Sequence, residues 1–256
     1  MTGAVLEARG LTVGYGAVAV AGGIDLTLTA GTVTCLLGPN GVGKTTLFKT
    51  LLGLIAPLAG SIDVGGESLA GLSRMAVARQ VGYVPQASLP DFTYTVLDLV
   101  VMGRTAYLGP FTQPRQADYD IARAALDALG IANLAEKDST RISGGQRQLV
   151  LIARALAQEA QVLVMDEPTA SLDLANRILV LGKVRALAGD GRAVLVSTHE
   201  PEHAFAIADR VALLGAGDFF ETGPVAEMLT AARLTRLYGV RLEVERTPSG
   251  RYVVGG

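Results

Sequence analysis

The chain has 256 residues, of which 50% are hydrophobic and 18% are charged, and its formal net charge at pH 7 is −2. The 31 glycines are scattered rather than periodic and a single cysteine is present, which excludes collagen-like, disordered and disulfide-stapled classes. The slightly acidic balance lacks the basic footprint of a nucleic-acid-binding protein, so we expect no nucleic-acid partner.

No segment has the pattern of a membrane span or of a signal peptide. The longest stretch without a charged residue is 26–43, but threonines, glycines, Pro39 and Asn40 interrupt it, whereas a spanning helix needs about 20 predominantly apolar residues. The N-terminus lacks a basic segment followed by an apolar one. We therefore expect a cytosolic chain, whose apolar excess suggests a surface that docks on another molecule.

Hydrophobic patterning in the first third of the chain predicts strands, a loop and a helix. Residues 24–37 alternate apolar and polar side chains around a central glycine, which predicts two strands joined by a turn. The second strand leads into a glycine-rich loop at 38–43, and a helix is expected at 45–55. A short strand is expected at 81–85.

The middle of the chain is predicted to form a helical lobe inserted into an α/β core. Residues 87–157 contain an apolar segment, a Gly-Pro loop and two helices, at 117–129 and 146–157. Two continuous apolar strands follow, at 162–165 and 194–197, of the kind that forms a parallel sheet buried on both faces.

The changes in predicted secondary structure along the chain define the expected domains. In the C-terminal part, short strands are expected at 219–222 and 241–244 around a helix. We assign residues 1–86 and 158–215 to the α/β core with an N-terminal antiparallel β region, 87–157 to the helical lobe and 216–256 to a C-terminal β/α extension.

The glycine-rich loop matches the phosphate-loop pattern, and it lies between a predicted strand and a predicted helix, as that pattern requires. Its backbone N–H groups can converge on phosphate oxygens, Lys44 supplies a positive charge, and the Thr45 hydroxyl can ligate Mg²⁺. A glycine turn that merely starts a helix is the alternative, but it does not explain the Lys-Thr pair. The predicted nucleotide-binding residues here are Gly38, Pro39, Asn40, Gly41, Gly43, Lys44, Thr45 and Thr46.

Two acidic residues follow the predicted strand at 162–165. Asp166 would lie at the carboxyl end of a core strand, where ligands bind in open α/β sheets, and could position Mg²⁺. Glu167, one residue further on, could accept a proton from an attacking water molecule. Because acidic residues often follow strands, this pair is a weak signal alone. Its functional interpretation is favoured because the same chain contains the phosphate loop.

A second anion-binding helix start is predicted at Ser143, Gly144, Gly145 and Gln146. Ser143 can cap the following helix, and the two glycines leave backbone amides open to an anion. Two phosphate-binding termini in one chain make sense if the second completes the nucleotide site of a partner copy. An ordinary Ser-Gly helix start would explain Ser143 but not the whole string.

Together these motifs resemble the nucleotide-binding subunit of ATP-binding-cassette (ABC) transporters over nearly the whole chain. The Lys44 loop resembles the Walker A motif and Asp166-Glu167 the Walker B motif. The Ser143 string resembles the signature motif, in which Ile142 replaces the usual leucine. Four further positions match the family's patterns: Gln86 the Q-loop, Asp173 the D-loop, His199 the switch histidine and Tyr15 the aromatic residue that stacks on adenine.

The resemblance implies a P-loop (RecA-like) ABC ATPase fold and ATP hydrolysis with Mg²⁺. It implies that Thr45, Gln86 and Asp166 hold the metal, that Glu167 activates water, and that His199 aligns water with the γ-phosphate. It also implies a head-to-tail dimer, in which the Ser143 string of one copy clamps the ATP bound to the other.

Transport further implies a separate membrane permease and, indirectly, an external substrate-binding protein, with this chain peripheral on the cytoplasmic face of the membrane. The permease-docking region of the family corresponds to residues 91–97, and we expect Tyr94 and its neighbours, including Phe92, to receive a permease helix. A core role for Phe92 and Tyr94 is the alternative.

Residues 94–104 and 237–240 are similar to importers of metal chelates, a branch that includes uptake of ferric siderophores, haem and cobalamin. The alternatives are import of molybdate, tungstate or another substrate, an exporter motor, and a non-transport ABC ATPase. A phosphate-loop kinase does not explain the Ser143 string.

Residues 199–203 formally match H-E-x-x-H, the zinc-protease motif. That chemistry needs both histidines within one helix, but Pro201 fits only the first turn of a helix and would leave His199 before it. We therefore expect no zinc and take His203 as a surface or lobe-contact residue. Cys35 is expected to be a small core residue.

Overall fold

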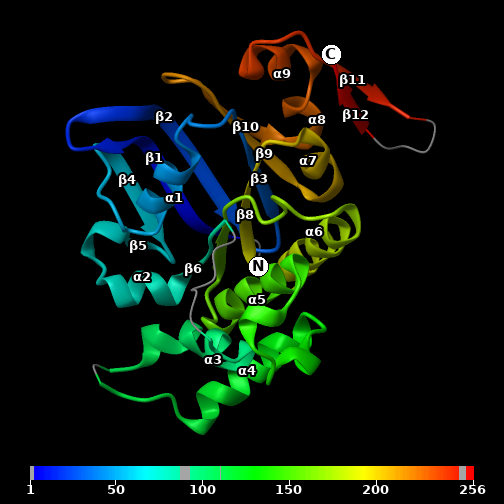
Figure 1. The fold of residues 1–256 in the computed structure, drawn as a ribbon. Coiled ribbons are helices and arrows are strands. Elements are labelled where there is room, and N and C mark those ends of the chain that lie inside the picture. The colour runs from blue at the N-terminus through cyan, green and yellow to red at the C-terminus, as the bar shows by residue number, and fades with distance from the viewer. Residues whose placement is uncertain (1–2, 87–92, 110, 248–251) are drawn as a thin grey trace.

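The computed structural model describes residues 3–86, 93–109, 111–247 and 252–256. The central strands are β3 (Val33–Leu37), β6 (Val81–Val84), β7 (Val162–Met165), β8 (Ala193–Thr198), β9 (Arg210–Leu214) and β10 (Phe220–Pro224). They form one sheet in the order β10-β9-β3-β8-β7-β6, parallel throughout except for β10 (Figure 1). The predicted parallel sheet is therefore confirmed.

A second, antiparallel sheet is formed in the order β2-β1-β4-β5. Its strands are β1 (Ala4–Tyr15), β2 (Val18–Thr29), β4 (Ala59–Val64) and β5 (Glu67–Ser68). The central sheet is buried on both faces. Leu36 of β3 joins the core shared with the antiparallel sheet, whereas its neighbour Cys35 joins the core shared with the helices. Burial raises the pKa of the Cys35 thiol to about 12, as suits the predicted core residue.

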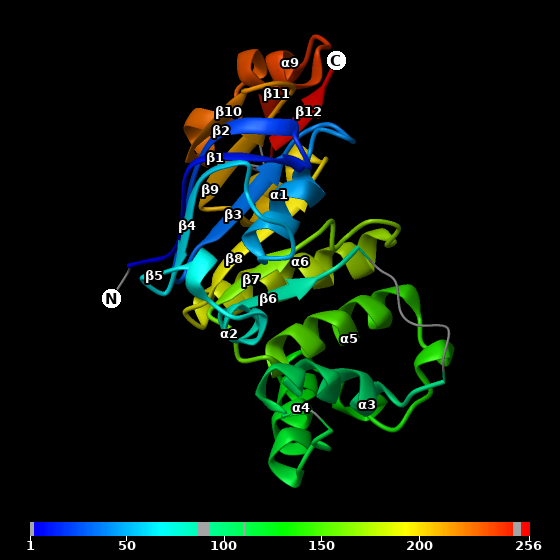
Figure 2. The same ribbon diagram turned by 90° about the vertical axis from the view of Figure 1, so that its left-hand side faces the viewer.

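Helices between β6 and β7 gather at one end of the molecule, away from the antiparallel sheet (Figures 1 and 2). They are α3 (Val96–Val101), the 3₁₀ helix η2 (Met102–Tyr107), α4 (Gln116–Ala128) and α5 (Gly144–Ala157). Their buried faces form one cluster with the helical side of the central sheet. The two predicted helices are confirmed, whereas the lobe boundaries remain a prediction.

The remaining elements lie outside the central and antiparallel sheets. They are α1 (Lys44–Leu51), α2 (Arg74–Gln80), α6 (Leu174–Gly189), α7 (Pro201–Ile207), α8 (Val225–Met228), α9 (Ala231–Tyr238), the hairpin β11 (Glu243–Arg246) and β12 (Tyr252–Gly255), and the 3₁₀ turns η1 (Leu69–Gly71), η3 (Ala132–Leu134) and η4 (Ser139–Arg141). The C-terminal elements α9, β11 and β12 lie at the end opposite the helical lobe (Figure 2).

One prediction of local structure was wrong, and one helix was missed. The helix expected at 45–55 ends at Leu51, because Gly53 adopts a φ of 66° and the N–H of Leu54 closes on the Lys49 carbonyl, a glycine-based C-cap. Helix α6 was not predicted, because Leu174, Ile178 and other exposed apolar residues blur its periodicity.

Candidate functional site

The phosphate loop connects β3 to α1, and its glycines are required by its geometry. A Cβ atom at Gly38 would lie 2.3 Å from the carbonyl oxygen of Leu214. Gly41 and Gly43 have φ values of 80° and 111°, which other residues rarely adopt. Gly43 is the N-cap of α1, so the first N–H groups of that helix face the end of the loop. The loop is therefore shaped to offer N–H groups to an anion.

The ammonium group of Lys44 is buried inside this loop. It donates hydrogen bonds to the carbonyls of Gly38 (2.8 Å) and Pro39 (3.2 Å), and it lies 3.7 Å from Oε1 of Glu167. Burial lowers the pKa of Lys44, while the carboxylates of Glu167 and Asp166 act in the opposite direction. The positive charge of Lys44 is thus directed at the centre of the loop by backbone oxygens.

Asp166 follows β7 and is held from two neighbouring elements. Its Oδ2 accepts a hydrogen bond from Thr45 Oγ1 at 3.1 Å, and its Oδ1 accepts one from Ser197 Oγ at 2.7 Å. Ser197 lies on β8, which is hydrogen-bonded to β7 in the central sheet. These bonds place two of the predicted metal-binding residues, Thr45 and Asp166, in direct contact.

Glu167 is fixed in an uncommon conformation. Its φ is 45°, in the left-handed region that favours glycine, and its N–H donates to Ser197 Oγ at 2.9 Å. Oε2 of the carboxylate lies 3.4 Å from Nδ1 of His199. The exposed fraction of the Glu167 side chain is 14%. The backbone therefore turns this carboxylate toward both Lys44 and His199.

Lys44, Thr45, Asp166 and Glu167 line one cleft of about 450 Å³, whereas His199 is not among its lining residues. The predicted Gln86 also lines this cleft. Residues 87–92, which follow it, are outside the described part of the chain. The cleft lies at the carboxyl ends of β3, β6 and β7, where α/β sheets bind ligands. Its lining residues are Val20, Asn40, Gly41, Gly43, Lys44, Thr45, Thr46, Gln86, Asp166 and Glu167.

The oxygen donors of this cleft suit a magnesium ion better than zinc. Thr45, Gln86 and Asp166 offer hydroxyl, amide and carboxylate oxygens, the ligand types that Mg²⁺ accepts beside nucleotide phosphates. Within the described residues, no group of three or more His, Cys, Asp or Glu side chains is placed to hold a metal ion.

Tyr15 lies at the end of β1, outside the residues that line the cleft. Its exposed fraction is 49%, and Nζ of Lys49 lies 5.9 Å from the centre of its ring. The neighbouring Thr46 hydroxyl, followed by Lys49, lowers the pKa of Tyr15. An exposed ring beside α1 is thus available for stacking.

The Ser143 string begins α5 as predicted. Ser143 Oγ accepts a hydrogen bond from the N–H of Gln146 at 3.3 Å, and Gln146 Oε1 accepts one from the N–H of Ser143 at 3.1 Å, which together form a capping box. Ser143 and Gly144 are exposed, while a Cβ atom at Gly145 would lie 2.2 Å from Asn176 Oδ1. The four residues of the string are not among those that line the cleft of the same chain.

Comparison with known proteins identifies the family of this chain. Residues 21–170 match the family model described as ABC transporter, which is more than half of the chain. This chain belongs to the ABC transporter family. It is accordingly an ATPase of the ABC fold that binds ATP.

Three relatives are similar in sequence to this ABC transporter chain over most of their length. An uncharacterized ABC transporter ATP-binding protein of Haemophilus influenzae is 43% identical, with 91% of this chain and 89% of the relative covered. The molybdate import ATP-binding protein MolC of the same species is 39% identical, with 84% and 80% covered. The hemin import ATP-binding protein HmuV of Nocardia farcinica is 39% identical, with 93% and 84% covered.

A solved structure matches the ABC chain almost end to end. It is an inward-facing ABC transporter described as being of metal-chelate type, with 34% identity and a TM-score of 0.87. The match covers 99% of this chain and 98% of that one, so it includes the C-terminal extension. Among the described residues of this ABC chain, no helix combines the length and apolarity needed to cross a membrane.

The D-loop position of this ABC chain caps α6. Asp173 accepts hydrogen bonds from the N–H of Asn176 (2.8 Å) and from its side-chain amide (2.9 Å). Ser171, two residues earlier, has a φ of 61°. The turn before α6 is therefore tightly specified, and like the Ser143 string it lies outside the cleft lining.

The expectation that His203 is a surface or lobe-contact residue was wrong. Its exposed fraction is 5%, because α7 packs its ring beneath β8, with Nδ1 3.1 Å from Thr198 Oγ1 and 3.4 Å from Thr169 Oγ1. Nε2 lies 3.2 Å from Glu200 Oε2 but outside hydrogen-bond geometry. The helix begins at Pro201, as predicted, so His199 lies before it.

Two polar groups at this site were missed by the sequence reasoning. Ser197 connects Asp166 to the N–H of Glu167, and Arg177 of α6 donates to Glu200 at 2.7 Å, beside His199. The signal available for Ser197 was that an otherwise apolar strand ends in Ser-Thr at the edge where the site lies. Nothing in the sequence connects Arg177 to Glu200.

Proposed function

We propose that this chain is the ATP-hydrolysing subunit of an importer that takes up a metal chelate, such as a ferric siderophore, haem or cobalamin, through a separate permease. The observation that carries the ATPase part is the convergence of Lys44, Thr45, Asp166 and Glu167 in one cleft. The likeness to a structure of metal-chelate type and to a hemin import protein supports the substrate class.

The nucleotide is proposed to bind with its phosphates in the loop and its base on Tyr15. Lys44 already points into the loop, so its charge meets the β- and γ-phosphates without rearrangement of the backbone. The half-exposed ring of Tyr15 offers an aromatic face to adenine. Asn40, Gly41 and Thr46 complete the wall of the cleft.

Thr45, Gln86 and Asp166 are proposed to hold Mg²⁺. When bound, the ion would neutralise charge on the β- and γ-phosphate oxygens. The residues of this chain supply orientation, because Ser197 and Thr45 fix both carboxylate oxygens of Asp166 before any ligand arrives.

Glu167 is proposed to accept the proton of the attacking water, and His199 to align that water with the γ-phosphate. Their side chains lie 3.4 Å apart, so both could contact the same water molecule. Phosphoryl transfer depends mostly on positioning and electrostatics, which this rigid arrangement provides.

A second copy of the chain is proposed to complete each site. Ser143, Gly144, Gly145 and Gln146 begin a helix whose capping box uses the N–H groups of Ser143 and Gln146 but not those of the two glycines, and the four residues do not line their own chain's cleft. In a head-to-tail pair they would face the γ-phosphate of ATP bound to the partner, and Asp173 would lie at the same interface.

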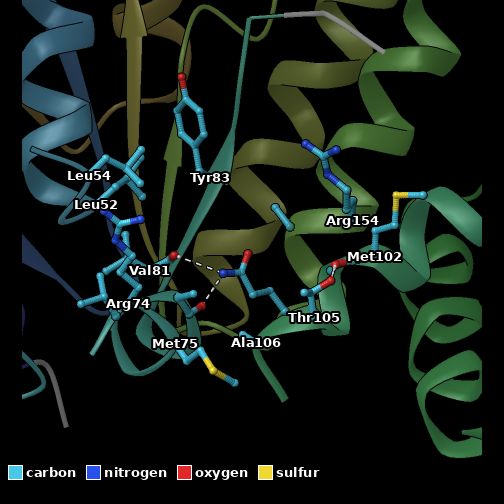
Figure 3. Close-up of a pocket in the computed structure, with 15 residues that line it drawn as sticks. Leu52, Leu54, Arg74, Met75, Val81, Tyr83, Met102, Thr105, Ala106 and Arg154 are labelled. Carbon is cyan, nitrogen blue, oxygen red and sulfur yellow. Dashed lines mark hydrogen bonds between the residues drawn. The ribbon is translucent and has the colours of Figure 1, made fainter. Parts of the chain in front are cut away.

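The permease is proposed to dock along a groove between α2 and the helical lobe. One part, of about 460 Å³, is lined mainly by apolar side chains, including Leu54, Met75 and Met102, and is flanked by Arg74 and Arg154 (Figure 3). The adjoining part, of about 760 Å³, includes the exposed Tyr94. The predicted neighbours Asp91 and Phe92 lie outside the described residues.

This groove suits a short apolar helix with an acidic end, which is the occupant that we propose. Docking there would place the chain on the cytoplasmic face of the membrane as a peripheral subunit. Substrate choice would then belong to the permease and to an external binding protein. Molybdate import is a second candidate, because the MolC protein is 39% identical to this chain.

Deletion of this chain in its native cell tests the proposed function. We expect uptake of one labelled metal chelate among iron-siderophore, haem and cobalamin to fall, and to recover with the wild-type chain but not with Glu167→Gln. A loss confined to molybdate would favour the second candidate. Unchanged uptake of all four compounds would contradict the import function.

A further inference from the structure

The C-terminal extension contacts the segment that carries His199. Tyr238, the last residue of α9, donates its hydroxyl hydrogen to the backbone carbonyl oxygen of His199 at 3.2 Å. The two residues are 39 positions apart in the sequence. The contact therefore exists only because the extension folds back toward the end of β8.

Two further contacts attach the extension to α7, which begins two residues after His199. Phe205 and Tyr252 stack with ring centres 4.1 Å apart and an interplanar angle of 7°. The N–H of Val254 donates to Glu202 Oε1 at 3.1 Å. The hairpin β11–β12 thus holds the helix, while α9 holds the residue before it.

The position of His199 depends on its backbone. Its side chain is 47% exposed, and its ring lies 3.4 Å from Glu167. The backbone on its C-terminal side is anchored by the N–H of Glu200, which donates to Thr198 Oγ1 at 3.1 Å. The carbonyl of His199 belongs to the same peptide group as that N–H, so Thr198 and Tyr238 hold this peptide from its two sides. Without the Tyr238 bond the peptide would be held from one side only, and its rotation would shift the ring of His199.

We infer that the C-terminal extension positions His199 for ATP hydrolysis through the Tyr238 hydroxyl, which makes Tyr238 a positioning residue. The inference rests on the proposed role of His199 in aligning water with the γ-phosphate. It gives the C-terminal extension a function in the ATPase reaction itself, although none of its described residues lines the phosphate cleft.

The hydroxyl group of Tyr238 stays protonated and can therefore donate its hydrogen bond at every assay pH. Burial, with the nearby charge of Glu202, raises the pKa of Tyr238 to about 12. Its hydroxyl therefore keeps its proton throughout the pH range in which an ATPase is assayed.

The first test is Tyr238→Phe in the full-length chain, because phenylalanine keeps the ring and removes only the donor. We expect kcat for ATP hydrolysis to fall about two- to tenfold, the effect of losing one hydrogen bond. KM for ATP should not change, because the phosphate loop and Tyr15 are untouched.

A matched control is available in the helical lobe. Tyr107 donates its hydroxyl hydrogen to the carbonyl of Gln158 at 3.0 Å, which is the same kind of bond, far from His199 along the chain. Tyr107→Phe should lower Tm about as much as Tyr238→Phe and leave kcat at the wild-type value. Equal kcat losses in the two variants would reduce Tyr238 to a structural role and overturn the inference.

A double-mutant cycle tests whether Tyr238 acts through His199. In a His199→Ala background, Tyr238→Phe should cause no further loss of kcat, because the group that it positions is gone. Independent, multiplicative losses would overturn the inference. If His199→Ala alone retains wild-type kcat, the proposed role of His199 fails; if only Tyr238→Phe retains it, the failure is confined to the inference.

Discussion

Ser197 donates its hydroxyl hydrogen to Asp166 across two adjacent parallel strands, at 2.7 Å. The same oxygen accepts the N–H of Glu167 at 2.9 Å, in the residue whose φ is 45°. One hydroxyl therefore holds both acidic residues of the Walker B pair.

Ser197→Ala should lower kcat about tenfold, because the partly buried N–H of Glu167 loses its partner and the strained conformation of Glu167 loses a support. ATP affinity should change little, since Lys44 is untouched. Steady-state hydrolysis and equilibrium nucleotide binding measure the two effects.

Thr34→Val is the control for this change. Thr34 is a buried hydroxyl on β3 whose oxygen has no hydrogen-bond partner in the described part of the chain, so its removal should leave kcat and Tm unchanged or slightly raise Tm. A Ser197→Ala enzyme with wild-type kcat would show that the bond does not position Glu167.

Glu167→Gln should bind ATP, form a stable dimer and hydrolyse ATP at least about a hundredfold more slowly than the wild type, because the amide cannot accept the proton of water. Nucleotide-dependent size-exclusion chromatography and phosphate release measure the two outcomes. Glu136→Gln, at an exposed position of the helical lobe, should behave as wild type. Rapid turnover by Glu167→Gln would remove Glu167 as the base.

Mixing two inactive variants tests whether each site spans two copies. Lys44→Ala should lose ATP binding, and Ser143→Arg should block the clamp on the partner's nucleotide while leaving the cleft of its own chain intact. Co-expressed, they form mixed dimers in which one of the two composite sites is wholly wild type. Recovery of ATPase activity is expected in the mixture, and its complete absence would favour sites contained in one chain.

Tyr94→Glu should uncouple ATP hydrolysis from transport. A carboxylate in the groove that contains Tyr94 disfavours an apolar permease helix, while the phosphate cleft is unaffected. Basal ATPase activity of the chain alone should stay at the wild-type level and uptake should fall by about tenfold or more. Normal uptake by this variant would place the docking surface elsewhere.

His203 should make stability depend on acid pH. Burial, only partly opposed by Glu200, lowers the pKa of His203 in the folded chain, so between pH 7 and 5 the unfolded chain, with a histidine pKa of about 6.5, binds more protons. The contribution of neutral His203 is therefore complete above that range and is lost as pH falls. His203→Gln should flatten the decline of Tm from pH 7 to 5, and parallel curves for the two proteins would contradict this.

The motifs of this chain could be predicted from the sequence because each of them lies within a few consecutive residues. Gly38, Gly43 and Lys44 lie within one loop, and Asp166-Glu167 directly follows one strand, so spacing alone indicated a nucleotide site at the edge of a parallel sheet. The capping box between Ser143 and Gln146 is equally short-range.

Other features depended on contacts between distant segments. Ser197 meets Asp166 across 31 positions, and Tyr238 meets His199 across 39. His203 looked like a surface residue in a polar stretch, yet α7 turns it beneath β8. Sequence patterns report periodicity within one element, whereas these contacts arise from how elements pack. The sequence alone determined the nucleotide chemistry. Only the tertiary structure decided which groups hold Asp166, Glu167 and His199 in place.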